Sequence, residues 1–289
     1  MNAPEPRLSS PSATAPVVDP HALLSARYGT APEGVPSIAL NPVLETLLSH
    51  RSVRAFLPDA LPAGTLEWLI AAAQSASSSS NLQVFSVVAV EQSARKAALA
   101  ELAGNQSFIR DAPVFLAWLI DLSRIEQIAR DTAAPAEGLK YLDTFIMGAI
   151  DAALAAQNVF TAAESLGLGG VYVGALRNQP EPVSAVLGLP QHVFPIFGLA
   201  LGRPDPARPA DVKPRLAQSL MLHREQYSQA PIAERIADYD AHIEAFNRAQ
   251  GQPPARWTER TLARLKDGAA LRGRDRLKEA LANQGFELR

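Results

Sequence analysis

The sequence contains no cysteine among its 289 residues. Disulfides, thiolate metal sites, iron–sulfur clusters and cysteine nucleophiles are therefore excluded. Histidine is also scarce, and none of the five shows HExxH or another metal-ligand spacing, so no metal site is expected. They stand at His21, His50, His192, His223 and His242.

An excess of charge of one sign is missing as well. The 27 basic and 29 acidic residues give a formal net charge of −2, whereas a nucleic-acid-binding domain normally shows a strong basic excess. Long hydrophobic runs are also missing. The most apolar segment, Val114–Ile120, is too short to span a bilayer, and residues 1–20 lack the pattern of a signal peptide. We therefore expect no nucleic-acid or membrane partner and, by default, a cytoplasmic location.

The residues that are present indicate an ordinary globular protein, because 47% are hydrophobic and 19% are charged. Residues 1–20 differ from the rest, with five prolines among alanines and serines, a composition that cannot bury enough surface to fold. We predict a disordered or extended tail over 1–40 and one domain over 41–289. That domain carries a helical extension from about residue 209 onward.

Hydrophobic periodicity predicts an α+β fold with a mixed or mainly antiparallel sheet. Helices alternate with about four strands, but without the regular spacing of a doubly wound fold. Helices are expected at 21–27, 42–48, 65–75, 94–103 (capped by Ser93), 137–166, 181–187, 233–248 and 259–285, and strands at 84–90, 114–121, 171–173 and 193–201.

The stretch His50-Arg51-Ser52-Val53-Arg54 is the clearest candidate site. Its two guanidiniums suit the oxygens of a phosphate, which they can bind bidentately. A solvated surface is the alternative, since paired arginines often face water. The motif therefore suggests a phosphate-bearing ligand without establishing one.

Other motifs also bear on whether the chain binds a phosphate-bearing ligand. Ser77–Ser80 could present hydroxyls to a ligand or form a flexible loop, and Lys213-Pro214-Arg215 could bind an anion or be a basic linker. The cluster Gly167–Gly170 follows a helix and precedes a strand, the reverse of the dinucleotide fingerprint, so a helix cap is expected there. Gly174, at the end of a strand, favours close approach of a flat ligand.

Together these motifs resemble the oxygen-insensitive NADPH nitroreductases, the family that includes the NADPH-FMN oxidoreductases. The resemblance rests on His50–Arg54, Ser77–Gln83, Gly104–Gln106, Ala162–Gly174 and Lys213–Arg215, in the same order and at similar spacing. It covers roughly residues 41–289. It implies a nitroreductase-like fold, an intertwined homodimer and one non-covalent FMN per subunit, with NADPH as electron donor.

The resemblance also implies which residues hold FMN. In this family FMN itself carries out the redox chemistry, so no catalytic side chain is expected. Ser78 and Ser80 would contact the flavin from the second subunit, and Arg51 is our candidate for stabilising the reduced ring. The matching positions are His50, Arg51, Ser52, Arg54, Ser78, Ser80, Gln106, Tyr172, Val173, Gly174, Lys213 and Arg215.

Three further residues concern the substrates. Arg248 matches an arginine that would select NADPH, and Arg274 matches an arginine at the mouth of the active site. The loop after Arg248 keeps Arg256 but lacks the family's run of adjacent basic residues. A solvated basic face is the alternative for all three arginines. Asn81 stands where a phenylalanine is expected, which affects the range of acceptors.

The expected function is an FMN-dependent NAD(P)H oxidoreductase that reduces nitroaromatics, quinones or similar acceptors by two-electron, ping-pong transfer. An NADPH-dependent FMN reductase would show the same motifs and remains an alternative. A non-redox flavin-binding protein and a cofactor-free helical binding protein are the alternatives from other classes.

Overall fold

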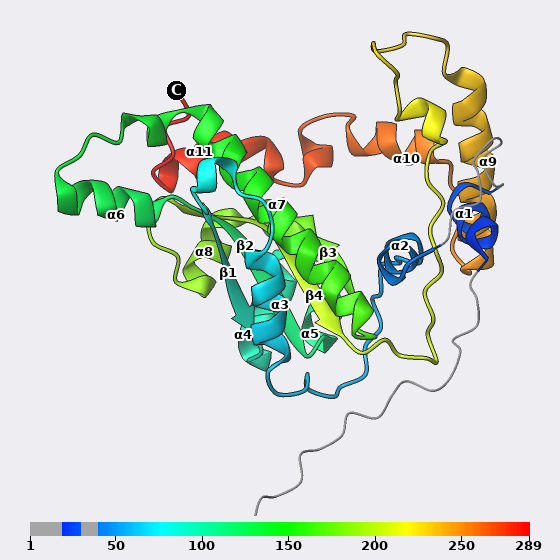
Figure 1. Cartoon of the computed structure of the whole chain (residues 1–289), viewed down its shortest axis with the longest axis horizontal. Coiled ribbons are helices and arrows are strands. Elements are labelled where there is room, and N and C mark those ends of the chain that lie inside the picture. The colour runs from blue at the N-terminus through cyan, green and yellow to red at the C-terminus, as the bar shows by residue number, and fades with distance from the viewer. Residues whose placement is uncertain (1–18, 30–39) are drawn as a thin grey trace, which may run out of the picture.

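The computed structural model describes residues 19–29 and 40–289, so most of the predicted tail lies outside the described residues. Figure 1 shows the arrangement of its elements. The helices are α1 (Pro20–Tyr28), α2 (Pro42–Leu48), α3 (Thr65–Gln74), α4 (Ser93–Leu102), α5 (Ser107–Asp111), α6 (Ser123–Thr132), α7 (Leu142–Ser165), α8 (Pro180–Leu187), α9 (Ala233–Ala249), α10 (Trp257–Arg264) and α11 (Leu277–Asn283), and the strands are β1 (Phe85–Val90), β2 (Val114–Asp121), β3 (Gly169–Val173) and β4 (Val193–Gly202).

The four strands form one antiparallel sheet in the order β1-β2-β4-β3. This confirms the α+β class predicted from the sequence. All eight residues of β2 are buried, because helices cover both faces of the sheet. Successive side chains of a strand point to opposite faces, so Phe115 and Ala117 pack in one core cluster while Leu116 and Trp118 pack in another.

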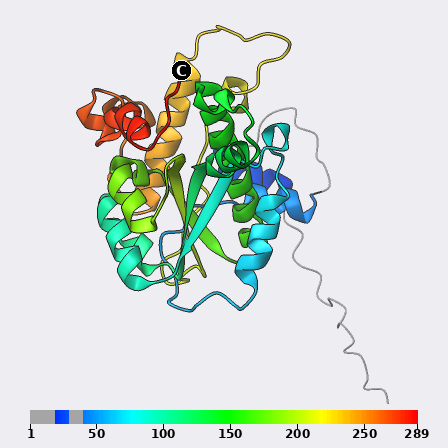
Figure 2. The same ribbon diagram turned by 90° about the vertical axis from the view of Figure 1, so that its left-hand side faces the viewer.

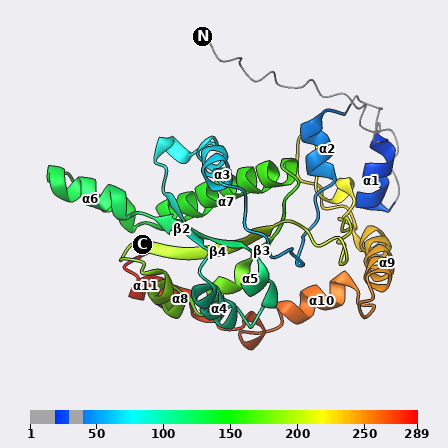
Figure 3. The same cartoon turned by 90° about the horizontal axis from the view of Figure 1, so that it is seen from below.

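Helices lie on the two faces of the sheet in separate layers, as Figures 2 and 3 show. Helices α3 and α7 cover one face, and α4, α5 and α8 cover the other. Helix α7 approaches its face closely because small residues, Ala155, Ala156 and Ala163, are fully buried along it. Edge strand β3 follows α7 directly and therefore lies beside the C-terminal end of this helix.

Helix α7 is, among the described residues, the one helix long and apolar enough to cross a membrane by length and composition. Its inner face packs on the sheet instead. A Cβ atom added at Gly148 would lie 2.6 Å from Cγ2 of Ile120, which shows how closely helix and strand approach. Helix α7 is the core helix of this fold.

The C-terminal part differs from its prediction. A single helix over 259–285 was expected, but α10 ends at Arg264 and α11 begins at Leu277, with two short 3-10 turns between them. Gly273 adopts a φ of +86°, and a Cβ atom there would lie 2.5 Å from the carbonyl oxygen of Asn178. The chain therefore bends where glycine permits close packing against Asn178.

Three smaller differences concern the helices. Ser93 begins α4 without capping it through its side chain, and a 3-10 turn over Glu137–Lys140 precedes α7 where a continuous helix was expected. Helix α6 was not predicted, although its strongly one-sided polar pattern is typical of an exposed helix.

The predicted extension from about residue 209 forms an arm. Helix α9 lies at one side of the molecule beside α1, away from the sheet, and α10 packs against α9 (Figures 1 and 3). Helix α1 belongs to the segment predicted as a tail, yet Pro20–Tyr28 is helical, with Asp19 accepting a hydrogen bond from the backbone N–H of His21. The segments that join these helices carry several of the candidate site residues.

Candidate functional site

The motif His50–Arg54 is fixed to the start of edge strand β3. The backbone N–H of Val53 donates to the carbonyl of Gly170 at 2.8 Å, and Ser52 forms a parallel bridge with the same glycine. A Cβ atom at Gly169 would lie 2.7 Å from Cγ2 of Val53. Gly169 thus lets this motif approach the strand closely, and Gly170 binds it through its backbone carbonyl.

The first glycine of that cluster ends the preceding helix, as predicted. Gly167 adopts a φ of +75° directly after the C-terminus of α7. The backbone N–H of Leu168 donates back to the carbonyl of Ala163 at 3.0 Å, which satisfies an acceptor at the helix end.

The structure brings the two predicted phosphate motifs together. His50–Arg54 and Lys213–Arg215 line one hollow of about 320 Å³, although they are far apart in the sequence. The lining residues are His50, Arg51, Ser52, Arg54, Ala55, Arg208, Pro209, Ala210, Asp211, Lys213, Arg215, Phe246, Gln250 and Gln252.

The positive charges of Arg54, Lys213 and Arg215 in this hollow repel one another. Within residues 19–29 and 40–289, no carboxylate forms an ion pair with Arg54, Lys213 or Arg215. Desolvation lowers the pKa of Lys213, and the nearby charges of Arg54, Arg260 and Arg215 lower it further. Partial desolvation lowers the pKa of Arg54, although the residue remains exposed on the surface of the chain. A bound anion would relieve this repulsion, so the donor set fits a phosphate group.

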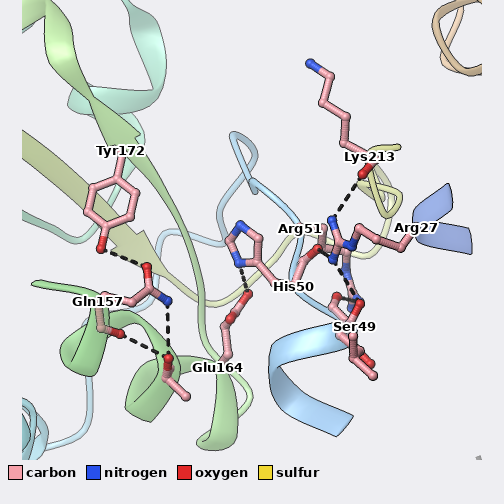
Figure 4. A network of polar contacts seen from close by, with 10 residues as sticks. Arg27, Ser49, His50, Arg51, Gln157, Glu164, Tyr172 and Lys213 are labelled. Atoms are coloured by element: carbon pink, nitrogen blue, oxygen red, sulfur yellow. Dashed lines mark hydrogen bonds and ion pairs between the residues drawn. The ribbon is translucent and has the colours of Figure 1, made fainter. Parts of the chain in front are cut away.

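His50 meets an acidic partner that the sequence analysis did not select. Its Nδ1 lies 2.8 Å from Oε1 of Glu164, at the end of α7 (Figure 4). The imidazole also packs edge-on against Phe160, with ring centroids 4.9 Å apart. Glu164 lay within the predicted Ala162–Gly174 motif, but only folding reveals that it orients His50.

Tyr172 and Val173 differ in their surroundings. Val173 is buried, whereas the Tyr172 ring reaches the surface and packs edge-on against Phe160 and Phe197. Its hydroxyl lies 3.4 Å from Oε1 of Gln157 (Figure 4). Burial, with a smaller contribution from Glu164, raises the pKa of Tyr172 well above its ordinary value. Tyr172 is therefore a neutral aromatic side chain near the edge strand.

A second cationic cluster lies at the other end of β3. A Cβ atom at Gly174 would lie 3.4 Å from the guanidinium of Arg177, and Nε of Arg274 donates to Oδ1 of Asn178 at 2.8 Å. Desolvation lowers the pKa of Arg274 to about 10, helped by the charges of Arg177, Arg264 and Arg272. Arg274 was predicted, but Arg177 was not, because nothing in its local sequence shows which arginines fold beside it.

Gln106 lies in a loop next to this second cluster. Its side-chain amide donates to the carbonyl of Ala103 at 2.8 Å, and it precedes α5 as the N-cap residue. A Cβ atom at Gly104 in the same loop would lie 3.9 Å from Nδ2 of Asn178. Gln106 and Gly174 thus belong to the Arg274 end of the edge strand.

The serine loop is organised by a buried carboxylate. Ser78 donates from Oγ to Oδ2 of Asp151 at 2.6 Å, and the backbone N–H of Ser79 donates to Oδ1 at 3.0 Å. Asp151 lies on α7 with 1% of its surface exposed. Ser80 and Asn81 adopt φ values of +48° and +55°, so the loop is held in an unusual conformation and is not simply flexible.

Within one chain, the serine loop and the phosphate motifs do not meet. Asp151 holds the serine loop and Glu164 holds His50, and both residues lie on α7. They are thirteen positions apart, which separates them by about 20 Å along the helix axis. The structure therefore does not bring Ser78 and Ser80 to the hollow that contains Arg54 and Lys213.

Arg248 lies exposed near the end of α9. In the described part of the chain, no hydrogen bond or ion pair joins its side chain to the Arg274 cluster. The described residues also contain no group of three or more acidic, histidine or cysteine side chains that could hold a metal.

Comparisons with known proteins identify the family. The family model described as "Nitroreductase family" matches residues 47–203, and the model for the C-terminal domain of the same family matches residues 213–289. The two matches together cover the sheet, the helices on its two faces and the arm, whereas helix α1 and most of α2 precede them.

Individual proteins agree with these matches. The chain is 40% identical over 220 residues to an oxygen-insensitive NADPH nitroreductase of Salmonella typhimurium, covering 76% of this chain and 88% of the relative. It is 36% identical to an FMN reductase (NADPH) of Bacillus subtilis, covering 86% and 99%.

A solved structure gives the same result. The NADPH:FMN oxidoreductase from Vibrio harveyi, complexed with NAD+, superimposes with a TM-score of 0.76 at 35% identity. That match covers 86% of this chain and 100% of the other. Sequence motifs, fold and relatives thus agree, and the chain belongs to the nitroreductase family.

Proposed function

We propose that this member of the nitroreductase family is an FMN-dependent oxidoreductase that takes electrons from NADPH and passes them to nitroaromatics, quinones or similar acceptors. The main observation in support of this proposal is the hollow that His50–Arg54 and Lys213–Arg215 line together. Three of its cations, Arg54, Lys213 and Arg215, form no ion pair with a carboxylate in the described part of the chain, which suits the phosphate of FMN.

The phosphate would be bound by Arg54, Lys213 and Arg215. A phosphomonoester carries about −1.5 to −2 charges near neutral pH, so these side chains can neutralise it. Each charge-assisted hydrogen bond contributes about 1.5–3 kcal/mol, so a few hold the cofactor without a covalent link. His50, oriented by Glu164, and Ser52 complete this end of the site.

The other residues would serve the flavin ring and the donor. When bound, FMN supplies hydride transfer, and the protein contributes binding and orientation. Val173, Gly174 and Gln106 lie toward the second cationic cluster, and Tyr172 lies between the two ends. Arg51 is proposed to stabilise the reduced ring.

The second cluster is the proposed site for the phosphate that distinguishes NADPH from NADH. Desolvation lowers the pKa of Arg274, and the charge of nearby Arg177 lowers it further. An anion bound between them would remove that repulsion. Arg248 and Asn81 remain proposed contacts of NADPH and of the acceptor.

We further propose a homodimer with one FMN per subunit, in which Ser78 and Ser80 contact the flavin of the partner. The separation within one chain supports this, since Asp151, which holds the serine loop, and Glu164, which holds His50, lie about 20 Å apart along α7. The outer face of α7 supports association, since Ile146, Ile150 and Leu154 form an apolar row at helical spacing and are 44–51% exposed.

The test is anaerobic reduction of the purified protein. We expect bound FMN that NADPH bleaches faster than NADH does, followed by reoxidation with nitrofurazone or a benzoquinone. Steady-state rates should give the parallel reciprocal plots of a ping-pong reaction. A yellow protein that NADPH fails to bleach would instead be a non-redox flavin-binding protein, and a colourless one would contradict the FMN site.

An FMN reductase is the second candidate, because the Bacillus subtilis relative of that name matches over 99% of its length. In that case free FMN is the second substrate. Faster turnover of free FMN than of nitrofurazone or benzoquinone, at equal concentrations, would favour this candidate.

A further inference from the structure

Helix α1 lies outside the part of the chain that the family models describe, since these models cover 47–203 and 213–289. The Bacillus subtilis relative is matched over 99% of its length by 86% of this chain, so this chain carries residues beyond those shared. No functional role has been given to helix α1 so far, yet it contacts both motifs of the proposed phosphate site.

Arg27 makes these contacts from the last turn of α1. Its Nη2 donates to the carbonyl oxygens of Leu48 and His50, both at 2.9 Å, and its Nη1 donates to the carbonyl oxygen of Lys213 at 3.1 Å. Only 7% of its surface is exposed. Figure 4 shows that the Lys213 side chain runs away from Arg27 while its carbonyl faces the guanidinium.

The backbone of α1 strengthens the same connection. The N–H of Arg215 donates to the carbonyl of Arg27 at 2.8 Å, so α1 holds both cationic residues of the Lys213–Arg215 motif by their main chain. Gly29 ends the helix directly against His242 of α9, where a Cβ atom would lie 2.5 Å from the imidazole ring. Helix α1 is therefore fixed in place and not loosely attached.

Charge does not explain why Arg27 is buried there. Desolvation lowers the pKa of Arg27 and nearby Arg215 lowers it further, and these two effects outweigh the opposite effects of Tyr28 and Glu164. A planar guanidinium can, however, donate to several carbonyls at once in fixed directions, which an ammonium cannot do. The arrangement thus uses the geometry of arginine to join two segments that are more than 160 positions apart.

We propose that Arg27 is a positioning residue, which joins the His50–Arg54 and Lys213–Arg215 motifs and thereby sets the affinity of the site for the phosphate of its flavin. This inference rests on the proposed FMN-dependent function. Arg27 itself points at backbone carbonyls, so its effect on the ligand is exerted through the placement of Arg54, Lys213 and Arg215.

The experiment compares two ligands that differ only in the phosphate. Dissociation constants for FMN and riboflavin are measured by flavin fluorescence with the full-length apoprotein, for the wild type, Arg27→Ala and Arg27→Lys. We expect Arg27→Ala to weaken FMN binding about tenfold or more while riboflavin affinity changes less than about twofold. Arg27→Lys should fall between, because it keeps the charge but loses the fork.

Arg235→Ala is the matched control. This arginine also donates to two backbone carbonyls, those of Ser219 and Pro231, but it joins no part of the phosphate site. It should leave the ratio of FMN to riboflavin affinity at the wild-type value. Thermal unfolding of each apoprotein separates effects on binding from effects on stability.

Two results would overturn the proposal. Unchanged FMN affinity in folded Arg27→Ala would do so, and an equal loss for FMN and riboflavin would reduce Arg27 to a general structural role. If Arg27→Ala fails to fold, the same comparison with Arg27→Lys decides. A wild type that binds riboflavin as tightly as FMN would instead contradict the phosphate site itself, and hence the proposed function.

Discussion

Lys213 carries a charge that its surroundings oppose. Desolvation and three neighbouring arginines lower its pKa, so without a ligand it loses its proton at a lower pH than an ordinary lysine. An anion binds the protonated form more strongly. The contribution of Lys213 to phosphate binding is therefore complete below this lowered pKa and is lost as the pH rises from it toward the higher pKa that Lys213 has with the anion bound.

We predict from this that the dissociation constant for FMN increases between neutral pH and about pH 10. Fluorescence titrations across that range measure the effect. Lys213→Arg, which stays charged, should bind FMN equally at both ends of the range. A wild-type constant that stays flat up to the ordinary lysine pKa would show that Lys213 does not face the phosphate.

Substitutions of Arg274 and Arg248 are expected to differ in their effect on coenzyme choice. Arg274→Ala should raise the KM for NADPH about ten- to a hundredfold, the equivalent of one charge-assisted hydrogen bond, and leave the KM for NADH nearly unchanged. Arg248 lies outside the Arg274 cluster in the structure, so Arg248→Ala should have the smaller effect. Steady-state kinetics with both coenzymes test this ranking, which the reverse order would contradict.

At the scale of an element, the serine loop depends on one buried carboxylate of α7. Asp151→Ala leaves the Ser78 hydroxyl and the Ser79 N–H without their acceptor, which costs about 1–3 kcal/mol. We predict a lower thermal midpoint by roughly 2–10 °C and a loss of FMN affinity. Asp151→Asn, which keeps one acceptor, should lose less.

Asp143 provides the control for this substitution, because it lies exposed on the same helix. Asp143→Ala should leave FMN affinity unchanged. Equal FMN affinity in Asp151→Ala and the wild type would show that the conformation of the serine loop does not matter for the cofactor.

At the scale of the whole molecule, the exposed apolar row of Ile146, Ile150 and Leu154 on α7 is the proposed contact with a second subunit. Ile150 is 51% exposed in its centre. A glutamate there would bring a charge into the proposed subunit interface, so Ile150→Glu should produce monomers in sedimentation experiments. Because the serines of one chain would serve the flavin of the other, these monomers should also lose FMN.

Ile128→Glu is the control for the dimer prediction. Ile128 is 61% exposed on α6, which projects from the body away from α7 (Figure 1). This variant should keep the mass and cofactor content of the wild type. A monomeric Ile150→Glu that still binds FMN tightly would contradict a site shared between subunits.

The sequence by itself determined the class of the fold and much of the site. Alternating and continuous apolar runs placed all four strands, because burial on one or both faces of a sheet leaves a direct trace in the residue pattern. Short motifs with unusual chemistry, such as His50–Arg54 and Lys213–Arg215, could be recognised without coordinates. Both proved to line one hollow.

Only the tertiary structure decided which distant groups meet. Arg27, Glu164 and Asp151 carry no local signal of their roles, because each acts on backbone or side chains remote in the sequence. The break between α10 and α11 likewise depends on the contact of Gly273 with Asn178. Local patterns record burial and turn preference, whereas hydrogen-bond partners across the chain arise only when the fold brings them together.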